Sequence, residues 1–253
     1  MQFIRERVLA GEVMLGMGAN LGSSLTVEMI GAAGFDWTWI DCEHGAGDYS
    51  ELIPQLQAAS IYKAPPVVRI AWNEAPRFKR VLDLGAAGIM VPYVTSAREA
   101  EQAAAAMRYP PQGIRGVARF NRACGFGQNF DAYFNQANDN LLTVVQIETA
   151  ASVDRAEEIA AVAGIDVLFI GPLDLSVNMN RAQNYEHPEF EQAMDRVAAA
   201  CRKYGKAAGI LLPKLDYLAG WIKKGFTFLV VGSDGGCVAA GLKSIAEVCT
   251  QFK

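Results

Sequence analysis

The chain has 253 residues, of which 51% are hydrophobic and 20% are charged, as in an ordinary folded globular protein rather than a disordered one. Its 23 basic and 27 acidic side chains give a net charge of −4, and the basic residues form no stripe of the kind that nucleic acid or an anionic membrane requires. No apolar stretch is long enough to span a bilayer.

The cysteines indicate a reducing compartment. They are widely spaced and form no C-x-x-C pair, so neither a zinc ribbon nor a redox motif is predicted. Free thiols are typical of cytosol, and the charged start of the sequence, MQFIRERVLAGE, disagrees with a signal peptide. We therefore expect a cytoplasmic protein that binds neither membrane nor nucleic acid. The five cysteines are Cys42, Cys124, Cys201, Cys237 and Cys249.

Eight short apolar runs, each followed by a longer helical pattern, predict a repeated βα unit. Runs such as VVRI, VLFI and FLVV are apolar throughout, as are strands of a parallel sheet that is buried on both faces. Eight βα units in about 250 residues is the size of a (β/α)₈ barrel, or TIM barrel. The predicted strands are 13–18, 37–41, 66–70, 88–92, 142–147, 166–170, 207–211 and 227–231.

Local signals mark where the helices between these strands begin and end. Asp48 with Glu51, and Ser96 with Glu99, have the spacing of a capping box. We predict a single α/β domain over residues 1–253, with an open doubly wound sheet, which usually has fewer strands, as the alternative. Helix ends are also indicated by Pro188 at a first turn and by Gly85, Gly164, Gly205 and Gly225 before strands.

One long segment, residues 108–140, shows no clear periodicity and is rich in Gly, Asn, Arg and aromatic residues. Loops of this length inside a compact fold are usually functional or disordered. Because the segment combines arginines with aromatic rings, we expect an ordered loop that covers the substrate or contacts another subunit.

Ionisable and amide side chains follow several of the predicted strands. In a barrel of this type the chemistry takes place at the carboxyl ends of the strands, so these residues are expected to share one rim. They are Asp41, Glu43 and His44 after the second strand, Arg69 on the third, Gln146 and Glu148 on and after the fifth, and Asp174 after the sixth.

Glu148 and Asp174 are the candidate metal ligands on this rim. No cysteine or second histidine belongs to the pattern, so an all-oxygen site completed by water and substrate would suit Mg²⁺ or Mn²⁺. The alternative is a pair of unrelated carboxylates, with Asp174 capping the segment LSVNM that follows it.

His44 and Arg69 are the candidates for proton transfer and charge stabilisation. His44 follows a strand end beside two acids, which favours a base, whereas His187 precedes a predicted helix and is expected only to cap it. Arg69 ends an apolar strand and needs an anionic partner, because a buried unpaired charge is very costly. A substrate carboxylate or enolate oxygen would match its planar fork. An internal ion pair with Asp41 or Glu43 is the alternative.

Two glycine clusters follow predicted strands and need to be weighed, one for dinucleotide binding and one for phosphate binding. The glycines of residues 16–22 lack the G-x-G-x-x-G spacing of a dinucleotide site. The run 232–236 follows the last strand, where many barrels bind phosphate, but it could equally be a tight turn or a carboxylate-binding end. No P-loop or G-x-S-x-G motif occurs, which excludes the usual NTPases and serine hydrolases.

The polar residues lie within strings that resemble, in order and spacing, the HpcH/HpaI family of class II pyruvate aldolases. The resemblance runs from about Gly16 to Gly232. It implies a TIM barrel, a divalent metal ion (Mg²⁺, Mn²⁺ or Co²⁺) and reversible cleavage of a 4-hydroxy-2-oxo acid into pyruvate and an aldehyde. It also implies a homohexamer with exchanged C-terminal helices. The strings are GFDWTWIDCEH, PPVVRIAWN, LDLGAAGIMVP, RYPPQGIRGV, VVQIET and FIGPLDLS.

Carried over by position, the resemblance assigns roles to the rim residues. Glu148 and Asp174 would bind the metal. Gln146 and the backbone at Leu173, beside Asp174, would hold the pyruvate moiety. Arg69 would contact the substrate and stabilise the enolate-like transition state.

The resemblance also implies a base and its helper. His44 would be the catalytic base, and Asp83 matches a family residue that raises the basicity of this histidine. In a regular barrel, however, Asp83 ends the third helix and lies at the rim opposite His44. The contact therefore requires either an irregular helix or a neighbouring subunit.

The chain departs from the family pattern in three places. Cys42 replaces a glycine, residues 45–47 replace an Ala-Pro pair, and Leu173 stands where alanine is common, which would narrow the space beside the metal. The string FNRACGFGQNFDAYF resembles the sugar-acid members of the family. These changes leave the aldehyde open. Alternative functions are a related metal–enolate decarboxylase or acyl-CoA lyase, and a protein that binds an oxo acid without turnover.

Overall fold

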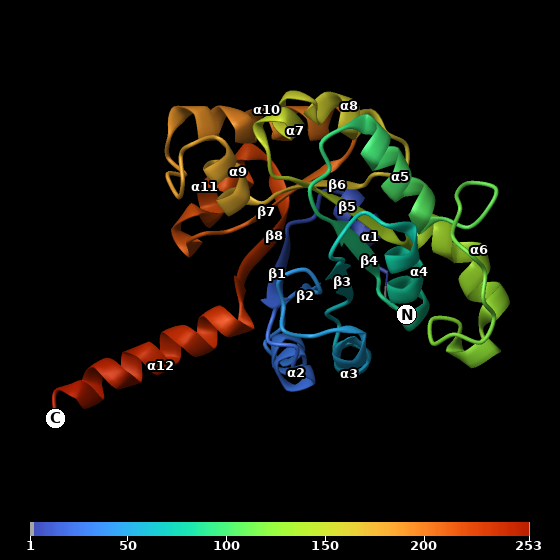
Figure 1. Cartoon of the computed structure of the whole chain (residues 1–253), viewed down its shortest axis with the longest axis horizontal. Helices are drawn as coiled ribbons and strands as arrows, with labels where there is room; N and C mark the ends of the chain where they lie inside the picture. The colour runs from blue at the N-terminus through green and yellow to red at the C-terminus, as the bar shows by residue number, and fades with distance from the viewer. Residues whose placement is uncertain (1–2, 253) are drawn as a thin grey trace.

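A computed structural model describes residues 3–252 and shows a closed barrel of eight parallel strands in sequence order (Figure 1). Because β8 pairs with β1, the barrel is confirmed and the open-sheet alternative is wrong. The predicted strand ends agree with the structure to within two residues. The strands are β1 Met14–Ala19, β2 Trp37–Asp41, β3 Pro66–Arg69, β4 Gly88–Val91, β5 Leu142–Ile147, β6 Val167–Ile170, β7 Ala207–Leu211 and β8 Phe226–Ser233.

Helices surround the barrel and join each strand to the next (Figure 1). None of those within residues 3–252 is long and apolar enough to cross a membrane. The helices are α1 Arg5–Leu9, α2 Ser24–Ala32, α3 Tyr49–Ala59, α4 Ala75–Leu84, α5 Ala97–Met107, α6 Phe130–Asn140, α7 Ala150–Asp154, α8 Ala156–Ala161, α9 Pro172–Asn178, α10 Pro188–Tyr204, α11 Leu218–Lys224 and α12 Asp234–Thr250, with short 3₁₀ turns at Gly125–Gly127 and Leu215–Tyr217.

Large aromatic side chains fill the interior of the barrel. The ring of Trp37 stacks on that of Phe228 with centroids 4.0 Å apart, and Phe169 meets Phe228 edge-on at 6.4 Å. Space for the indole depends on Gly16, because a Cβ there would lie 2.3 Å from Cε2 of Trp37. The interior is thus a packed core, as expected for a barrel of eight strands.

The first helix closes the amino-terminal end of the barrel. Ile4 and Val8 are buried within the same interior cluster as Trp37. Arg5 donates to Asp166 at 3.0 Å, and Asp166 also accepts from the backbone of Thr143, so this buried carboxylate is fully engaged. Within residues 3–252, α1 thus covers the amino-terminal end and the carboxyl-terminal end is left open.

The helix-boundary predictions are mostly confirmed. Asp48 forms a capping box with Glu51 at the start of α3. Ser96 caps α5 through the backbone of Glu99, but the Glu99 carboxylate turns back to Thr95 instead of completing the box. Each of the four glycines has a positive φ, at a helix end or in a turn before a strand, and His187 caps α10 as predicted.

The segment 108–140 is not one irregular loop, as the sequence suggested. Its second part forms α6, which buries Tyr133 and Ala137, a pair at helical spacing. The segment follows α5 and leads into β5, so it lies at the amino-terminal end of the strands. Within one chain it therefore does not cover the carboxyl-terminal rim, and the other expectation for this segment, contact with another subunit, stays a prediction.

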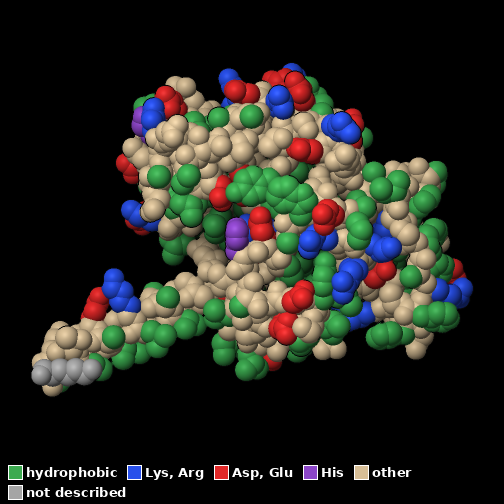
Figure 2. Space-filling view, viewed as in Figure 1, with side chains coloured by type: hydrophobic (Ala, Val, Ile, Leu, Met, Phe, Trp, Pro, Cys, Tyr) green, Lys and Arg blue, Asp and Glu red, His purple; other side chains and the backbone are tan. Residues whose placement is uncertain are grey.

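The last helix, α12, projects away from the barrel as an arm (Figure 1). Its direction is fixed by Asp234, which is 6% exposed. The Asp234 carboxylate accepts from the backbone N–H groups of Asn20 and Gly235 at 2.8 and 2.7 Å and from the Thr26 hydroxyl at 2.6 Å. Hydrophobic side chains run along the arm (Figure 2), among them Val238, Leu242, Ile245 and Val248, all of which are exposed.

Candidate active site

The predicted rim residues gather at the carboxyl ends of the strands. Acidic, basic and histidine side chains meet near the centre of the face in Figure 2, below a cluster of hydrophobic ones. Arg69, Gln146 and Glu148 are each at most 7% exposed, whereas His44 is exposed and Asp174 is half-buried. The site therefore has a buried floor and a solvent-accessible mouth.

Arg69 is held by the internal ion pairs that the sequence left open as an alternative. Residues 41 and 69 are direct partners in the β2–β3 register, so their side chains point the same way. Arg69 donates to Asp41 through Nε at 2.9 Å and through an Nη atom at 2.7 Å, a bidentate geometry. A second Nη atom lies 3.0 Å from Glu43, and the guanidinium lies 4.5 Å above the ring of Trp39.

Asp41 organises this corner of the site. Its Oδ1 also accepts from the backbone N–H groups of Glu43 and His44, at 3.0 and 3.2 Å. Burial alone would raise the pKa of Asp41, but the hydrogen bonds and charge of Arg69 lower it below the usual value. The carboxylate therefore stays ionised, and it fixes both the guanidinium and the turn that carries His44.

Glu148 is a buried acid with too little positive charge around it. Its two oxygens accept from the side chain of Gln146 at 2.9 Å and from the backbone N–H of Tyr93 at 3.0 Å. Burial, together with the charges of Asp174 and Glu43, raises the pKa of Glu148 to about 7. The carboxylate lies directly against Gly171, where a Cβ would be 2.4 Å from Oε1.

Asp174 lies next to Glu148 in the first turn of α9. It is not the helix cap that the alternative interpretation proposed, because Gly171 occupies that position. Tyr93 connects the two acids: its hydroxyl donates to Oδ1 of Asp174 at 3.2 Å, and its pKa is raised to about 12 by burial and the nearby acids, so it remains a donor. Leu173 is 51% exposed at the mouth.

The donor set at this point suits a hard divalent cation. Within residues 3–252 no three His, Cys, Asp or Glu side chains come together as a ready-made metal site. Two carboxylates with water and substrate oxygens would nevertheless suffice for an ion of the Mg²⁺ type. The buried Oε1 of Gln146 has no hydrogen-bond partner, and the raised pKa of Glu148 reports excess negative charge. A cation would compensate the negative charge at Glu148. It would also orient a bound ligand that could donate a hydrogen bond to Oε1 of Gln146.

Asp83 lies apart from the other predicted site residues. It is on the last turn of α4, a regular helix that ends at Gly85 before β4, and so is at the amino-terminal end of the barrel. Its carboxylate accepts from the fully buried Arg115 at 2.8 Å. An Asp83–His44 contact through an irregular helix is therefore not observed, which leaves a contact with a neighbouring subunit as the possibility.

The glycine run 232–236 forms the start of α12, where Ser233 is the cap. The backbone N–H of Gly235 donates to Asp234, and that of Gly236 donates to the Ser233 hydroxyl. These two N–H groups are therefore not free to bind phosphate. Within one chain these two N–H groups serve the start of α12, and the run's role as a tight turn or carboxylate-binding end stays a prediction.

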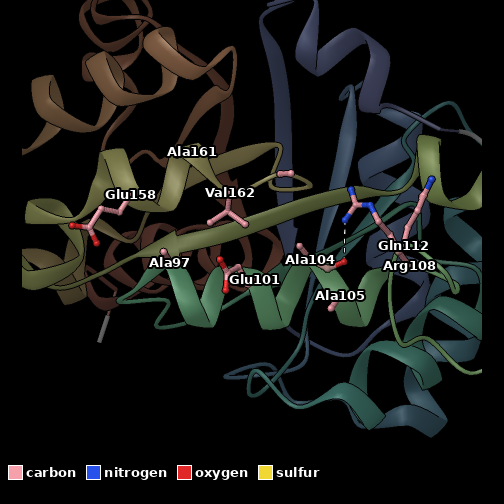
Figure 3. A pocket seen from close by; sticks show the side chains of 10 residues that line it. Ala97, Glu101, Ala104, Ala105, Arg108, Gln112, Glu158, Ala161 and Val162 are labelled. Atoms are coloured by element: carbon pink, nitrogen blue, oxygen red, sulfur yellow. Dashed lines mark hydrogen bonds between the residues drawn. The ribbon is translucent and has the colours of Figure 1, made fainter.

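A crevice of about 420 Å³ lies elsewhere, between α5 and α8 on the outside of the barrel (Figure 3). It is lined largely by alanines together with Arg108, Glu101 and Glu158. The guanidinium of Arg108 donates to the carbonyls of Ala104 and Gly164 and is therefore satisfied within the fold. This crevice is separate from the rim.

Sequence reasoning missed Tyr93 and left the role of Asp41 open. Tyr93 stands in a VPYVTS string whose residues carry no recognisable catalytic signature. Its importance depends on a backbone φ of +51°, which is uncommon for a residue other than glycine and is not visible in the sequence. Asp41 could have been identified from strand register, since it is aligned with Arg69.

The fold and rim define a (β/α)₈-barrel enzyme with a pair of acids, one buried and one half-buried, beside a guanidinium held by ion pairs. A family model described as HpcH/HpaI aldolase/citrate lyase matches residues 15–240, and the chain belongs to this family. It is accordingly a carbon–carbon lyase of the aldolase type.

Known relatives cover almost the whole chain. The 5-keto-4-deoxy-D-glucarate aldolase of Salmonella arizonae is 41% identical over 238 residues, which are 94% of this chain and 93% of its own. The crystal structure of a family protein from Burkholderia cenocepacia is 34% identical, with a TM-score of 0.91 over 97% of this chain and 98% of that one. The HpcH/HpaI aldolase from Desulfitobacterium hafniense is 27% identical, with a TM-score of 0.89 over 100% and 97%.

Proposed function

We propose that this enzyme reversibly cleaves a 4-hydroxy-2-oxo sugar acid, such as 5-keto-4-deoxy-D-glucarate, into pyruvate and an aldehyde acid. The observation that carries the proposal is the pair of the buried Glu148 and the half-buried Asp174 at the open end of the barrel beside Arg69. The names of relatives about 40% identical to the chain support the sugar-acid substrate.

Glu148 and Asp174 would hold a divalent metal ion, with Mg²⁺, Mn²⁺ and Co²⁺ as the candidates. Oxygen ligands suit these ions, and the charge of the pair is otherwise uncompensated. When bound, such an ion polarises the 2-keto oxygen of the substrate and stabilises negative charge there.

The neighbouring residues would position the pyruvate moiety. Gln146 has a free, buried carbonyl oxygen, and Leu173 presents its backbone in the first turn of α9, where N–H groups lack helical partners. Arg69 is oriented before substrate binds, because Asp41 and Glu43 hold it from two sides. Its fixed charge would stabilise the enolate as the bond between C3 and C4 breaks.

His44 would act as the base. It is exposed at the mouth, where it can reach the 4-hydroxyl of a bound substrate, and Asp41 fixes its backbone. Removing the hydroxyl proton lets the oxygen form the aldehyde carbonyl, while the electrons of the C3–C4 bond pass to the pyruvate enolate. The enolate is then protonated at C3. No lysine is among the predicted rim residues, so a Schiff base is not part of this scheme.

A neighbouring subunit would supply Asp83. In one subunit this residue lies at the far end of the barrel from His44, so we propose that an Asp83–His44 contact forms between subunits of a homohexamer. The exposed apolar stripe of α12 supports exchange of this helix, and Leu25 and Met29 of α2 are exposed apolar residues that could receive it.

Oligomerisation can be tested by changing Leu242 and Ile245 of α12 together to glutamate. Native mass spectrometry of the wild type should give a hexamer, and the double variant should give smaller species with a folded barrel by circular dichroism. A variant carrying glutamate at the exposed Leu215, outside α12, is the control. A monomeric wild type would contradict both the hexamer and the Asp83 contact.

The activity is tested by measuring pyruvate release from a panel of 4-hydroxy-2-oxo acids with and without Mg²⁺, Mn²⁺ or Co²⁺. We expect metal-dependent release that EDTA abolishes, with the six-carbon sugar diacid among the best substrates. Glu148→Gln and Asp174→Asn should be inactive. Release of CO₂ from oxaloacetate, with no cleavage of any hydroxy acid, would replace the proposal with that of a metal–enolate decarboxylase.

The proposed cellular location rests on the cysteines. All five cysteines are free, which is typical of proteins in a reducing compartment. We propose a cytoplasmic enzyme that acts on small molecules, and fractionation of the native host should find it in the cytoplasm.

A further inference from the structure

Tyr93 contacts both carboxylates of the candidate metal site from a single position on the loop after β4. Its backbone N–H donates to Oε2 of Glu148 at 3.0 Å, and its hydroxyl donates to Oδ1 of Asp174 at 3.2 Å. The two acids belong to different strand ends, 26 positions apart in sequence. Within residues 3–252 the side chain of Asp174 has no other hydrogen-bond partner.

The backbone at Tyr93 adopts a left-handed conformation with φ of +51°. Bulky residues rarely adopt this conformation, and where it persists the surroundings enforce it, often at functional sites. Here it allows one residue to direct its N–H toward Glu148 and its ring toward Asp174. The ring of Trp72 lies 6.3 Å away, centroid to centroid, and supports this placement.

We propose that Tyr93 is a positioning residue that sets both carboxylates for the divalent ion. The inference rests on the proposed metal site, but it concerns a residue that the resemblance does not assign. The hydroxyl occupies Oδ1 of Asp174 and leaves Oδ2 free, so the carboxylate would present one defined oxygen. Residues that hydrogen-bond to metal ligands fix their orientation, and their loss typically weakens metal binding about 10–100-fold.

The simpler interpretation is that Tyr93 only packs against Trp72 at the mouth. Tyr93→Phe separates the two interpretations, because it keeps the ring and the backbone N–H and removes only the hydroxyl. If the ring alone matters, metal binding is unchanged. If the hydroxyl orients Asp174, metal binding weakens while the fold is unaffected.

The experiment is titration of metal-free protein with Mn²⁺ alone, by calorimetry and electron paramagnetic resonance. For Tyr93→Phe we expect about a tenfold higher Kd and a changed Mn²⁺ spectrum, with the thermal midpoint in EDTA unchanged. Tyr217→Phe is the matched control, because Tyr217 also donates to an acid at 3.3 Å, but that acid is Glu186, which is not a proposed metal ligand. Its Kd should equal that of the wild type.

The outcomes separate this inference from the proposed reaction. An unchanged Kd and spectrum in Tyr93→Phe, with a wild type that cleaves its substrate, overturns the role of Tyr93 and leaves the aldolase intact. A weakened Kd in a protein that cleaves none of the hydroxy acids supports the role of Tyr93 and counts against the aldolase. Absence of Mn²⁺ binding by the wild type overturns both.

Discussion

Replacing Glu148 with glutamine should make the metal-free protein more stable at alkaline pH while removing a metal ligand. Glu148 is 2% exposed, and its pKa is raised from 4.5 to about 7. The folded protein therefore holds this proton more tightly than the unfolded chain does. Between pH 4.5 and 7 the unfolded state binds fewer protons, so stability falls as pH rises through this window.

The size of the effect follows from the shift of about 2.5 pH units, which corresponds to about 3 kcal/mol. A glutamine remains neutral and avoids this cost. Its hydrogen bonds can be kept, since its oxygen can accept from Tyr93 and its amide can donate to Gln146, whose Oε1 has no partner. In a chain of this size about 3 kcal/mol corresponds to a rise in Tm of roughly 10 °C.

The assay is thermal unfolding in EDTA from pH 5 to pH 8.5 at one protein concentration. The wild type and Glu148→Gln should have similar Tm values near pH 5 and diverge toward pH 8. With saturating Mn²⁺ the order should reverse, because only the wild type gains binding energy. Glu101→Gln changes an exposed acid and is the control. Parallel pH profiles for the wild type and Glu148→Gln would refute the reasoning.

Three further changes test other parts of the site. Arg69→Ala leaves the carboxylates of Asp41 and Glu43 without their cation and should lower the unfolding free energy at pH 8 by about 3 kcal/mol. Arg69→Lys should lose less, because it keeps the charge but not the bidentate hydrogen bonds to Asp41. A loss for Arg69→Ala below about 1 kcal/mol by urea denaturation would contradict the ion-pair account. Gly171→Ala places a Cβ 2.4 Å from the Glu148 carboxylate and should weaken Mn²⁺ binding at least tenfold; unchanged calorimetry would show that the carboxylate can move aside. His44→Ala should slow aldol cleavage by at least a hundredfold while metal binding is retained, and normal cleavage would remove His44 from the mechanism.

The barrel could be predicted from sequence because its strands are uniformly apolar and its turns carry strong local signals. The capping box at Asp48 and the glycines before the strands depend only on neighbouring residues, so they are visible in the sequence. The helix α6 could not be predicted because it lacks such local signals. Its sequence, FDAYFNQANDN, has weak helix formers, and only its packing against the barrel through Tyr133 and Ala137 defines it.

The rim residues could be predicted because strand ends in a barrel converge. The sequence could not decide which anionic group pairs with Arg69. Both a substrate anion and an internal acid were compatible with its position. The β2–β3 register, which aligns Arg69 with Asp41, identifies the internal acid. Tyr93 was invisible because its contacts depend on one backbone angle and on two acids distant in sequence. The assigned catalytic roles of His44 and Asp83 stay predictions.

The filled interior of the barrel has a consequence for the order of events. With Trp37 and Phe228 stacked inside and α1 across the amino-terminal end, reactants can come and go only through the mouth. Under the proposed chemistry the pyruvate part sits deepest and the aldehyde part nearest to solvent. Product release is then ordered, with the aldehyde leaving first and pyruvate second. In the synthetic direction, pyruvate has to bind before the aldehyde.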